Sequence, residues 1–332
     1  MKRIILPILC LLLICSCSPN KESEESTKKG SSGKTLEMLF VSEKRVYQGT
    51  TKDLVDSLFR MPQLGLPQAE PMFDLVHIPS SSFANTEMFK AHRNIIICDI
   101  NPENPNKVYF HKDQWSTPQV VFDFAVKSQE AFDTLLIKYY PTIKQEIYRA
   151  EHRRVIKAFK GIAGRDLMNS VYKQFGFRLT LSNEFELANM RNPQPEMAWI
   201  RKETKDFGIG VLVNVLPYTN EKIFEEDNMM DQIDSLMKHV EGPADSSYMG
   251  IERRVDSHFS QADFEQSKYA MELRGCWRLY GDFMGGPFVA YAALTPDQKH
   301  VVLMVGYVYC PRFGKRDYLM QVESICHSIK FE

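Results

Sequence analysis

A cysteine near the start of the chain stands in a setting that suits covalent modification of its thiol. The segment Leu11-Leu12-Leu13-Ile14-Cys15-Ser16-Cys17 ends an apolar run that follows Lys2 and Arg3. A positive start and a short apolar run are typical of an export signal, and this run is shorter than the about 20 apolar residues that span a bilayer. Small Ser16 directly precedes Cys17. We therefore expect cleavage before Cys17, which leaves its thiol on the first residue of the mature protein.

This pattern resembles the signal of bacterial lipoproteins, in which the cysteine thiol is diacylated before cleavage and the new amino terminus is usually acylated. The resemblance implies a signal peptide over residues 1–16, acyl chains such as palmitate on Cys17, and attachment to a membrane through that lipid. An ordinary secretory signal, cleaved at another site, is the alternative. Residues 18–35 contain no large apolar side chain, so they cannot bury enough surface to offset the entropy of ordering. We expect the lipidated cysteine and a flexible tether over residues 17–35.

An alternating segment from Tyr269 to Tyr280 carries charged residues on one face of a predicted strand. Glu272, Arg274 and Arg278 lie on that face, because successive side chains of a strand point to opposite sides. This face is a candidate ligand groove in which Arg274 and Arg278 bind an anion. A solvated sheet face with cross-strand ion pairs is the alternative, and we favour it.

A second candidate surface is basic. Arg149, Arg153, Arg154 and Lys157 fall within about two turns of a predicted helix, where Arg149, Arg153 and Lys157 share a face. Such a face attracts anionic headgroups or an acidic partner when a tether holds the protein near lipid. The alternative, a solvated helix face, is the commoner structure.

Motifs for catalysis, metals or cofactors are absent from the sequence. Ser170 and Ser235 begin Ser-x-x-Lys words but lack the companion motifs of serine acyltransferases, and no Gly-x-Ser-x-Gly occurs. The eight histidines form no His-Glu-x-x-His pair, and the glycine clusters fit neither a P-loop nor a dinucleotide fingerprint. We therefore predict no catalytic residue, no metal and no cofactor.

Four cysteines remain once the leader and the lipidated residue are set aside: Cys98, Cys276, Cys310 and Cys326. Cys98 ends an apolar run, so we expect a buried free thiol there. A bridge between two of the other three stays open, since four cysteines allow three pairings that sequence cannot separate.

The composition is that of a folded globular protein with little net charge. Hydrophobic residues make up 44 % and charged residues 25 % of the 332 residues, and the formal net charge is -1. Removing residues 1–16 takes away Lys2 and Arg3 and no acid, so the charge becomes -1 - 2 = -3. This balance argues against nucleic acid as a partner. The remaining length suits one large domain or two smaller ones.

Periodicity divides the body into two α+β halves, residues 36–175 and 176–332. In the first half the strands are predicted at 36–41, 73–78, 94–99, 107–111 and 119–125, and helices at 128–160 and 165–175. Pro141 predicts a kink or a break in the long helix. In the second half the strands are predicted at 177–181, 197–202, 208–216, 269–280, 287–294 and 300–309, and helices at 221–239 and 315–328.

We therefore predict an α+β fold of mainly antiparallel sheets packed against helices. The shared plan of the halves raises the hypothesis that they are two similar units. The second half also resembles the antiparallel sheet and helix sandwiches of the PsbP/Mog1 type.

Over its whole length the chain resembles an uncharacterised lipoprotein family of Bacteroidetes-type bacteria, a domain of unknown function. The segments that carry this resemblance are Leu13-Ile14-Cys15-Ser16-Cys17, Pro195-Glu196-Met197-Ala198-Trp199-Ile200-Arg201 and Tyr269-Ala270-Met271-Glu272-Leu273-Arg274-Gly275-Cys276-Trp277. The resemblance implies a lipid-anchored protein of the cell envelope, which we expect at the outer membrane with its face undecided. It supplies no activity.

Two functions follow from these features. The first is a non-enzymatic binding or scaffolding module, confined near the membrane, that meets an envelope protein or glycan partner. The alternative is a hydrolase acting on a cell-envelope component, with a site assembled from residues distant in sequence. A pocket that holds a histidine or carboxylate beside a nucleophile would favour the hydrolase, and an apolar or aromatic patch would favour the binding module.

Overall fold

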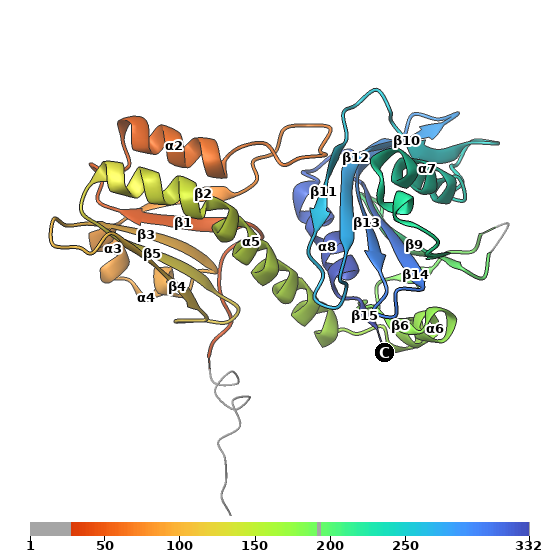
Figure 1. Ribbon diagram of the computed structural model, residues 1–332, viewed down its shortest axis with the longest axis horizontal. Coiled ribbons are helices and arrows are strands. Elements are labelled where there is room, and N and C mark those ends of the chain that lie inside the picture. The colour runs from red at the N-terminus through yellow and green to blue at the C-terminus, as the bar shows by residue number, and fades with distance from the viewer. Residues whose placement is uncertain (1–27, 191–193, 332) are drawn as a thin grey trace, which may run out of the picture.

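The computed structural model describes residues 28–190 and 194–331. The predicted lipobox and the first part of the predicted tether, up to residue 27, lie outside the described residues. Within these residues the chain forms seven α-helices and fifteen strands, which confirms the α+β prediction. Figure 1 shows two bodies, each built on its own sheet, with one long helix running from the first to the second.

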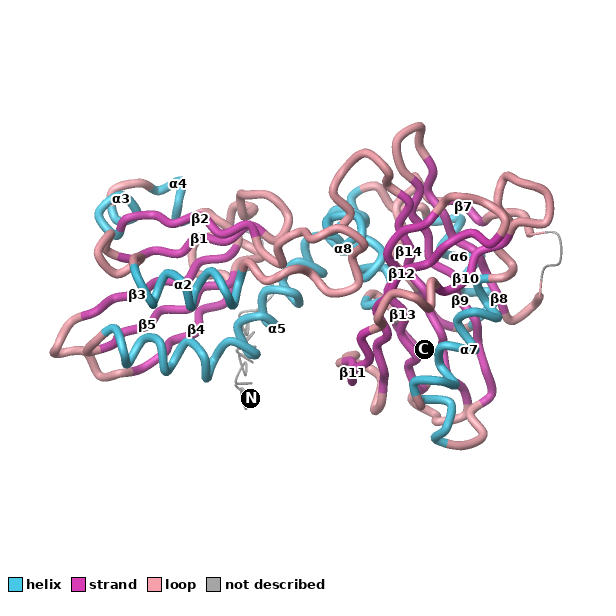
Figure 2. Tube along the Cα trace, turned by 90° about the horizontal axis from the view of Figure 1, so that it is seen from above, coloured by secondary structure: helices cyan, strands magenta, loops and turns pink. Residues whose placement is uncertain are grey.

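The first body is a five-stranded sheet in the order β2-β1-β3-β5-β4. Its strands are β1 (Glu37–Ser42), β2 (Asp74–Pro79), β3 (Asn94–Ile100), β4 (Lys107–Lys112) and β5 (Val120–Val126). The central position of β3, whose apolar run faces both sides, is as the sequence predicts. Helices α2 (Gly49–Phe59) and α5 (Gln129–Gly161) cover one face, and the short helices α3 (Ser80–Ala84) and α4 (Glu87–Lys90) lie on the other (Figure 2).

Four strands of this first sheet are parallel, so the mainly antiparallel character predicted for the chain comes from the larger second sheet. Strands β1, β2, β3 and β5 pair in parallel, and only edge strand β4 is antiparallel to its neighbour. The reason is connectivity, because helices link β1 to β2 and β2 to β3, and a strand that follows such a crossover runs parallel.

The second body is an eight-stranded antiparallel sheet covered by a helix on each face. Its path is β10-β12-β13-β14-β9-β8-β7, with β11 beside β12. The strands are β7 (Glu186–Leu187), β8 (Met197–Glu203), β9 (Gly208–Pro217), β10 (Tyr248–Ile251), β11 (His258–Ala262), β12 (Ala270–Tyr280), β13 (Gly285–Leu294) and β14 (His300–Tyr309). Helix α8 (Arg316–His327) packs on one face and α7 (Glu226–Met237) on the other. The hypothesis of two similar halves is therefore wrong, since the two sheets differ in direction and order.

Smaller elements complete the chain. Helix α6 (Arg165–Phe175) follows α5 and ends at Gly176, whose φ of 76° gives the left-handed cap that glycine adopts without strain. Strands β6 (Phe177–Arg178) and β15 (Lys330–Phe331) pair with each other, and a 3-10 helix spans Glu221–Phe224. No helix in residues 28–190 and 194–331 is long and apolar enough to cross a membrane.

Helix α5 runs unbroken for 33 residues, so the predicted break at Pro141 does not occur. Ser128 caps its start by accepting a hydrogen bond from the Ala131 amide. A proline removes the hydrogen bond to the carbonyl four residues earlier, here that of Ile137. Ile137 is 58 % exposed and Pro141 is also exposed, so the lost bond falls on the solvent side of the helix.

Helix α8 joins the two bodies at its first turn. The Glu70 carboxylate, from the loop before β2, accepts hydrogen bonds from the Lys315 and Arg316 amides at 2.7 and 3.1 Å. The Arg316 guanidinium pairs with Asp74 at 2.8 Å. Further along α8, Met320 is buried in the apolar core of the first body. These contacts fix α8 to both bodies at once.

Residues 28–35, predicted as the last part of a flexible tether, are instead bound to the first body as a strap. The Ser32 amide donates to the Ala91 carbonyl at 2.9 Å, and the Arg93 amide donates to the Ser32 carbonyl at 3.0 Å. Gly30 forms a further bridge with Thr117. The strap is polar in sequence, but its backbone amides and carbonyls form hydrogen bonds with neighbouring segments. Side-chain composition does not reveal this stabilisation.

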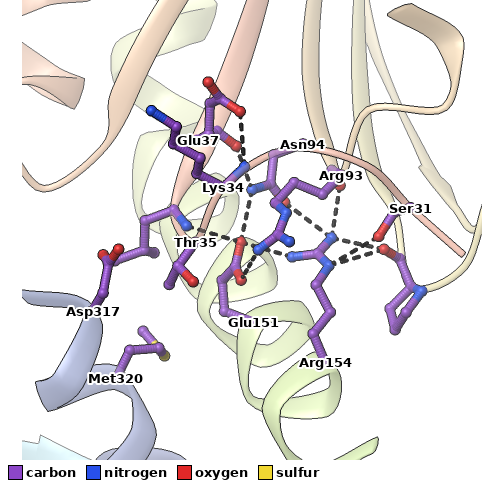
Figure 3. Close-up of polar contacts among 12 residues, drawn as sticks. Ser31, Lys34, Thr35, Glu37, Arg93, Asn94, Glu151, Arg154, Asp317 and Met320 are labelled. Atoms are coloured by element: carbon purple, nitrogen blue, oxygen red, sulfur yellow. Dashed lines mark hydrogen bonds and ion pairs between the residues drawn. The ribbon is translucent and has the colours of Figure 1, made fainter. Parts of the chain in front are cut away.

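The strap ends at a buried carboxylate on α5 (Figure 3). Glu151 is 1 % exposed and accepts from the Leu36 amide at 3.2 Å and from the Asn94 side-chain amide at 3.0 Å. Arg93 and Arg154 pair with its two oxygens at 2.9 and 2.8 Å. Glu151 thus binds α5 to the starts of both β1 and β3.

All four described cysteines, Cys98, Cys276, Cys310 and Cys326, are buried free thiols. This confirms the expectation for Cys98, and the bridge left open among the other three is not formed. Burial raises the pKa of the Cys98 and Cys326 thiols well above the ordinary range, so they are unreactive at neutral pH.

We predict that Glu151→Ala destabilises the protein by about 3–5 kcal/mol, because it leaves two buried guanidinium groups without their carboxylate. The change is measured by urea denaturation followed by circular dichroism. Glu87→Ala is the matched control, since Glu87 is 85 % exposed and pairs only with Lys90. The control loses less than about 1 kcal/mol. Equal stability of the two variants would contradict this role for Glu151.

Candidate functional site

A polar cleft of about 550 Å³ lies between the two bodies. Helix α5 lines one side, strands β11 and β12 line the other, and α8 closes the end. Figure 1 shows α5 descending alongside β11 and α8, between the two sheets. The loop before β2 borders the cleft, and the Gly65 carbonyl accepts a weak bond from the Cys276 thiol at 3.7 Å. Gly65 has a φ of 80°, and a side chain there would meet the Arg274 Cβ at 3.0 Å, so glycine suits this close approach.

The centre of the cleft is an arginine held between two carboxylates. Arg274 on β12 donates to both oxygens of Glu272, at 2.6 and 2.9 Å, and to Glu323 of α8 at 2.6 Å. The side chains of Arg274 and Glu323 are 9 % and 2 % exposed. Burial alone would raise the pKa of Glu272, but the adjacent guanidinium outweighs it and lowers that pKa. Arg274 thus binds both carboxylates, while the second oxygen of Glu323, Oε2, has no hydrogen-bond partner among the described residues.

Two histidines stack beside this triad. The rings of His152 (α5) and His327 (α8) lie 4.4 Å apart at an angle of 24°. Burial lowers the pKa of each from 6.5 to about 3, so both are neutral at physiological pH. The pair therefore adds no charge to the cleft.

A serine contacts one of these histidines, in the arrangement that a serine nucleophile and its base would have. The Ser324 hydroxyl lies 3.0 Å from Nδ1 of His152 and donates to the Met320 carbonyl at 2.6 Å. Because a hydroxyl has a single proton and a carbonyl only accepts, His152 Nδ1 must carry the proton in this contact. A protonated Nδ1 cannot remove the serine proton. Ser324 is also fully buried, so this pair is a structural hydrogen bond.

Lys144 is the cation of the cleft that has no acidic partner. Its side chain comes from α5, two turns before His152, and no hydrogen bond or ion pair joins it to another residue in the described parts of the chain. Burial lowers its pKa, and the positive charge of Arg274 lowers it further. Tyr148, one turn along, donates to Gln63 at 2.6 Å and closes the floor between the bodies. The charges of Glu272 and Glu323 act in the opposite direction on the pKa of Lys144, but neither carboxylate forms an ion pair with Lys144, so its partly buried ammonium can bind an anionic group.

The predicted ligand face on β12 is divided by the structure. Glu272 and Arg274 line the cleft, whereas Arg278 lies farther along the strand, 3.4 Å from Glu252 and over the ring of Tyr280. Arg274 is not available as the expected anion hook, because two carboxylates of its own chain already hold it. The favoured alternative of a solvated face also fails at Glu272 and Arg274, since α8 covers this side of the sheet.

The predicted basic surface is also divided. Arg154 is buried and corrects that prediction, because its guanidinium donates to the Arg93 and Pro118 carbonyls at 2.7 Å each (Figure 3). Arg149 borders the cleft and pairs with Asp263 of the second body and with Glu146. Arg153 and Lys157 remain on the outer side of α5, where Lys157 is exposed.

A second hollow, of about 630 Å³, lies on the opposite face of the second sheet. Trp199, Trp277 and Tyr307 form part of its lining. Their polar atoms are used internally, since Trp199 donates to the Tyr307 hydroxyl at 2.8 Å and Trp277 donates to the Val308 carbonyl at 3.2 Å. This hollow is therefore apolar at its base.

The fold and the cleft define a two-domain α+β protein with a polar site at the domain interface. Residues 165–328 match the family model described as Domain of unknown function (DUF4837), and residues 31–160 match that described as Domain of unknown function (DUF8532). The chain thus combines two domains of uncharacterised families. No curated protein matches the chain. Lys144, Tyr148 and His152 come from the first matched region, and the Arg274 triad comes from the second, so the cleft requires both domains.

The sequence identified only part of this site. The alternation of apolar and charged residues along one predicted strand identified Glu272 and Arg274 as candidate site residues. The residues it missed are helical and meet the strand only in three dimensions: Lys144, Tyr148, His152, Glu323 and His327. The one signal in the sequence was polar residues interrupting the apolar face of a long helix.

We predict that the histidine pair makes stability depend on pH. Between pH 6.5 and about pH 3, His152 and His327 bind protons in the unfolded chain but not in the folded protein. The stabilisation is therefore complete above pH 6.5 and declines as pH falls, by about 1.4 kcal/mol per pH unit for each histidine. The variant His327→Phe keeps a ring against Phe264 and Tyr291. In this variant the decrease in the free energy of unfolding between about pH 7 and about pH 5 should be smaller by about the contribution of one histidine. Urea denaturation at both pH values measures it, and an unchanged pH slope would contradict the assignment.

Proposed function

We propose that this protein is a membrane-anchored binding module of the cell envelope whose ligand site is the interdomain cleft. The observation that carries the proposal is Lys144, a partly buried ammonium that forms no ion pair, while the carboxylates of Glu272 and Glu323 near it are both held by Arg274. An envelope protein or glycan that presents a carboxylate or phosphate would complete this pairing.

Binding is favoured over hydrolysis by the directions of the hydrogen bonds. The cleft contains histidines, carboxylates and a serine, which are the residue types of a hydrolase. The protonated Nδ1 of His152 and the burial of Ser324 leave that serine without a base and without access to a substrate. Glu272 and Glu323 are both paired to Arg274, and this pairing lowers the pKa of Glu272, which makes Glu272 a poor general acid. The hollow beside Trp199, whose lining combines aromatic rings with charged residues, is the kind of surface that a binding module uses.

The proposed anchor is lipid on Cys17, and the proposed location is the outer membrane. The first described residue, Lys28, is eleven residues beyond Cys17. Eleven residues span at most about 40 Å even when fully extended. A lipid on Cys17 would therefore hold the folded body within a few nanometres of the bilayer.

We predict that Cys17→Ala releases the protein from the membrane fraction of cells, because acylation at this thiol is the proposed attachment. The measurement is fractionation followed by immunoblotting. Cys15→Ala is the matched control and should stay with the membranes. A Cys17→Ala protein that is retained as fully as the control would contradict lipid anchoring.

We predict that an envelope ligand protects Lys144 from acetylation by acetic anhydride, measured by peptide mass spectrometry on the purified protein with and without envelope extract. At a ligand concentration of twice Kd, the labelling of Lys144 falls by about threefold, because only the free fraction reacts. Lys138 is the internal control, since it is exposed on the same helix outside the cleft.

Equal labelling of Lys144 with and without extract, or equal protection at Lys138, would contradict a ligand in the cleft. Release of small products from the extract by the purified protein would instead support a hydrolase.

A further inference from the structure

Three cations on the outer side of α5 have no acidic partner. Lys157 and Lys160 are exposed, Arg153 is half-buried, and no ion pair joins any of them to a carboxylate in residues 28–190 and 194–331. They fall at positions four and three residues apart, which places them on one side of the helix. The neighbouring arginines differ, since Arg149 pairs with Asp263 and Arg154 with Glu151. These three residues are called the α5 basic face below.

The chain enters the first body next to this face. Ser31 of the strap lies 3.3 Å from Nε of Arg154, the residue that follows Arg153 on the helix. Lys28 and Lys29, at the start of the strap, are exposed and add two positive charges. In Figure 1 the strap and the second half of α5 descend on the same side of the molecule.

We propose that the α5 basic face, together with Lys28 and Lys29, binds the headgroups of anionic lipids and orients the body on the membrane. This goes beyond the proposed anchoring, which supplies proximity but no orientation. It rests on that anchoring for its setting, while the contact itself is testable on protein without lipid.

Charge and position both support a lipid surface as the occupant. The side chains are long, and none forms an ion pair with a carboxylate in the described residues, although Lys28 donates to the Asp113 carbonyl. They are concentrated where the described chain begins. Each Lys or Arg close to an anionic surface contributes about 1 kcal/mol of attraction. Five such residues within reach of one plane are enough for measurable binding when the anchor already confines the protein, whereas the almost neutral net charge gives no general attraction.

The test uses protein purified from residue 18 onward, which retains every described residue and carries no lipid. Binding is measured by co-sedimentation with phosphatidylcholine vesicles that contain about one third phosphatidylglycerol, and with phosphatidylcholine vesicles alone. The unmodified protein should bind the anionic vesicles only, and high salt should abolish the binding. Replacing Arg153, Lys157 and Lys160 with Gln should weaken binding by at least about tenfold.

The matched control replaces Lys205, Lys238 and Lys268, three exposed lysines of the second body, with Gln. Both triple variants remove three charges, so only the position of the charge distinguishes them. Equal binding by the two variants, or no binding of the unmodified protein to anionic vesicles, would overturn the inference. If binding is absent yet Cys17→Ala still leaves the membrane fraction in cells, the basic-face proposal fails while the proposed anchoring stands.

Discussion

The packing of one helix into two domains is the constraint on which the rest of this structure depends. The first half of α5 covers the parallel sheet, and its second half runs past α8 and the antiparallel sheet. A single rigid element of 33 residues therefore fixes the distance between the two sheets. The charged side chains along α5 face different surroundings, and their hydrogen bonds and ion pairs are formed with the groups they meet there. Glu151 accepts three hydrogen bonds and forms an ion pair with Arg154 within the first domain, while His152 is stacked against the second.

The same arrangement explains why the cleft is polar although it lies between two apolar cores. The apolar side chains of α5 and α8 are used in the cores of the two domains, with Met320 of α8 in the core of the first and Phe159 of α5 in the core of the second. The sides that remain to face each other carry tyrosine, histidine, glutamate and arginine. Burying them is tolerated because Arg274 has two carboxylates and Glu151 has two guanidinium groups, so that nearly every charge has an opposite charge at hydrogen-bond distance. Lys144 departs from this pattern, which is why the ligand is sought there.

Most strands could be predicted from the sequence, because β12 alternates between apolar and charged residues and β13 and β14 are continuous apolar runs. Strands β10 and β11 could not, since they are short and His258–Ala262 is mostly polar. The prediction of mainly antiparallel sheets holds for the chain, but the parallel pairing in the first domain could not be predicted, because the pattern of a single strand contains no information about its partner. At Pro141 a kink or a break was predicted, and the break does not occur, since the freed carbonyl lies on the solvent side of a continuous helix. The cleft was half predicted, since contacts such as Arg274 with Glu323, 49 residues apart, depend on packing.

The cap that Glu70 places on α8 bears on how the chain is to be divided for experiments. The matched regions, residues 31–160 and 165–328, invite expression of each domain alone. A fragment that begins at residue 165 would lack the carboxylate that satisfies the first amides of α8, and it would expose Met320, which is 1 % accessible in the whole chain. The first turn of its last helix would be frayed. Its surface would gain an exposed apolar side chain that promotes self-association. The unit of stability, and the unit that evolution can exchange, is therefore the pair of domains.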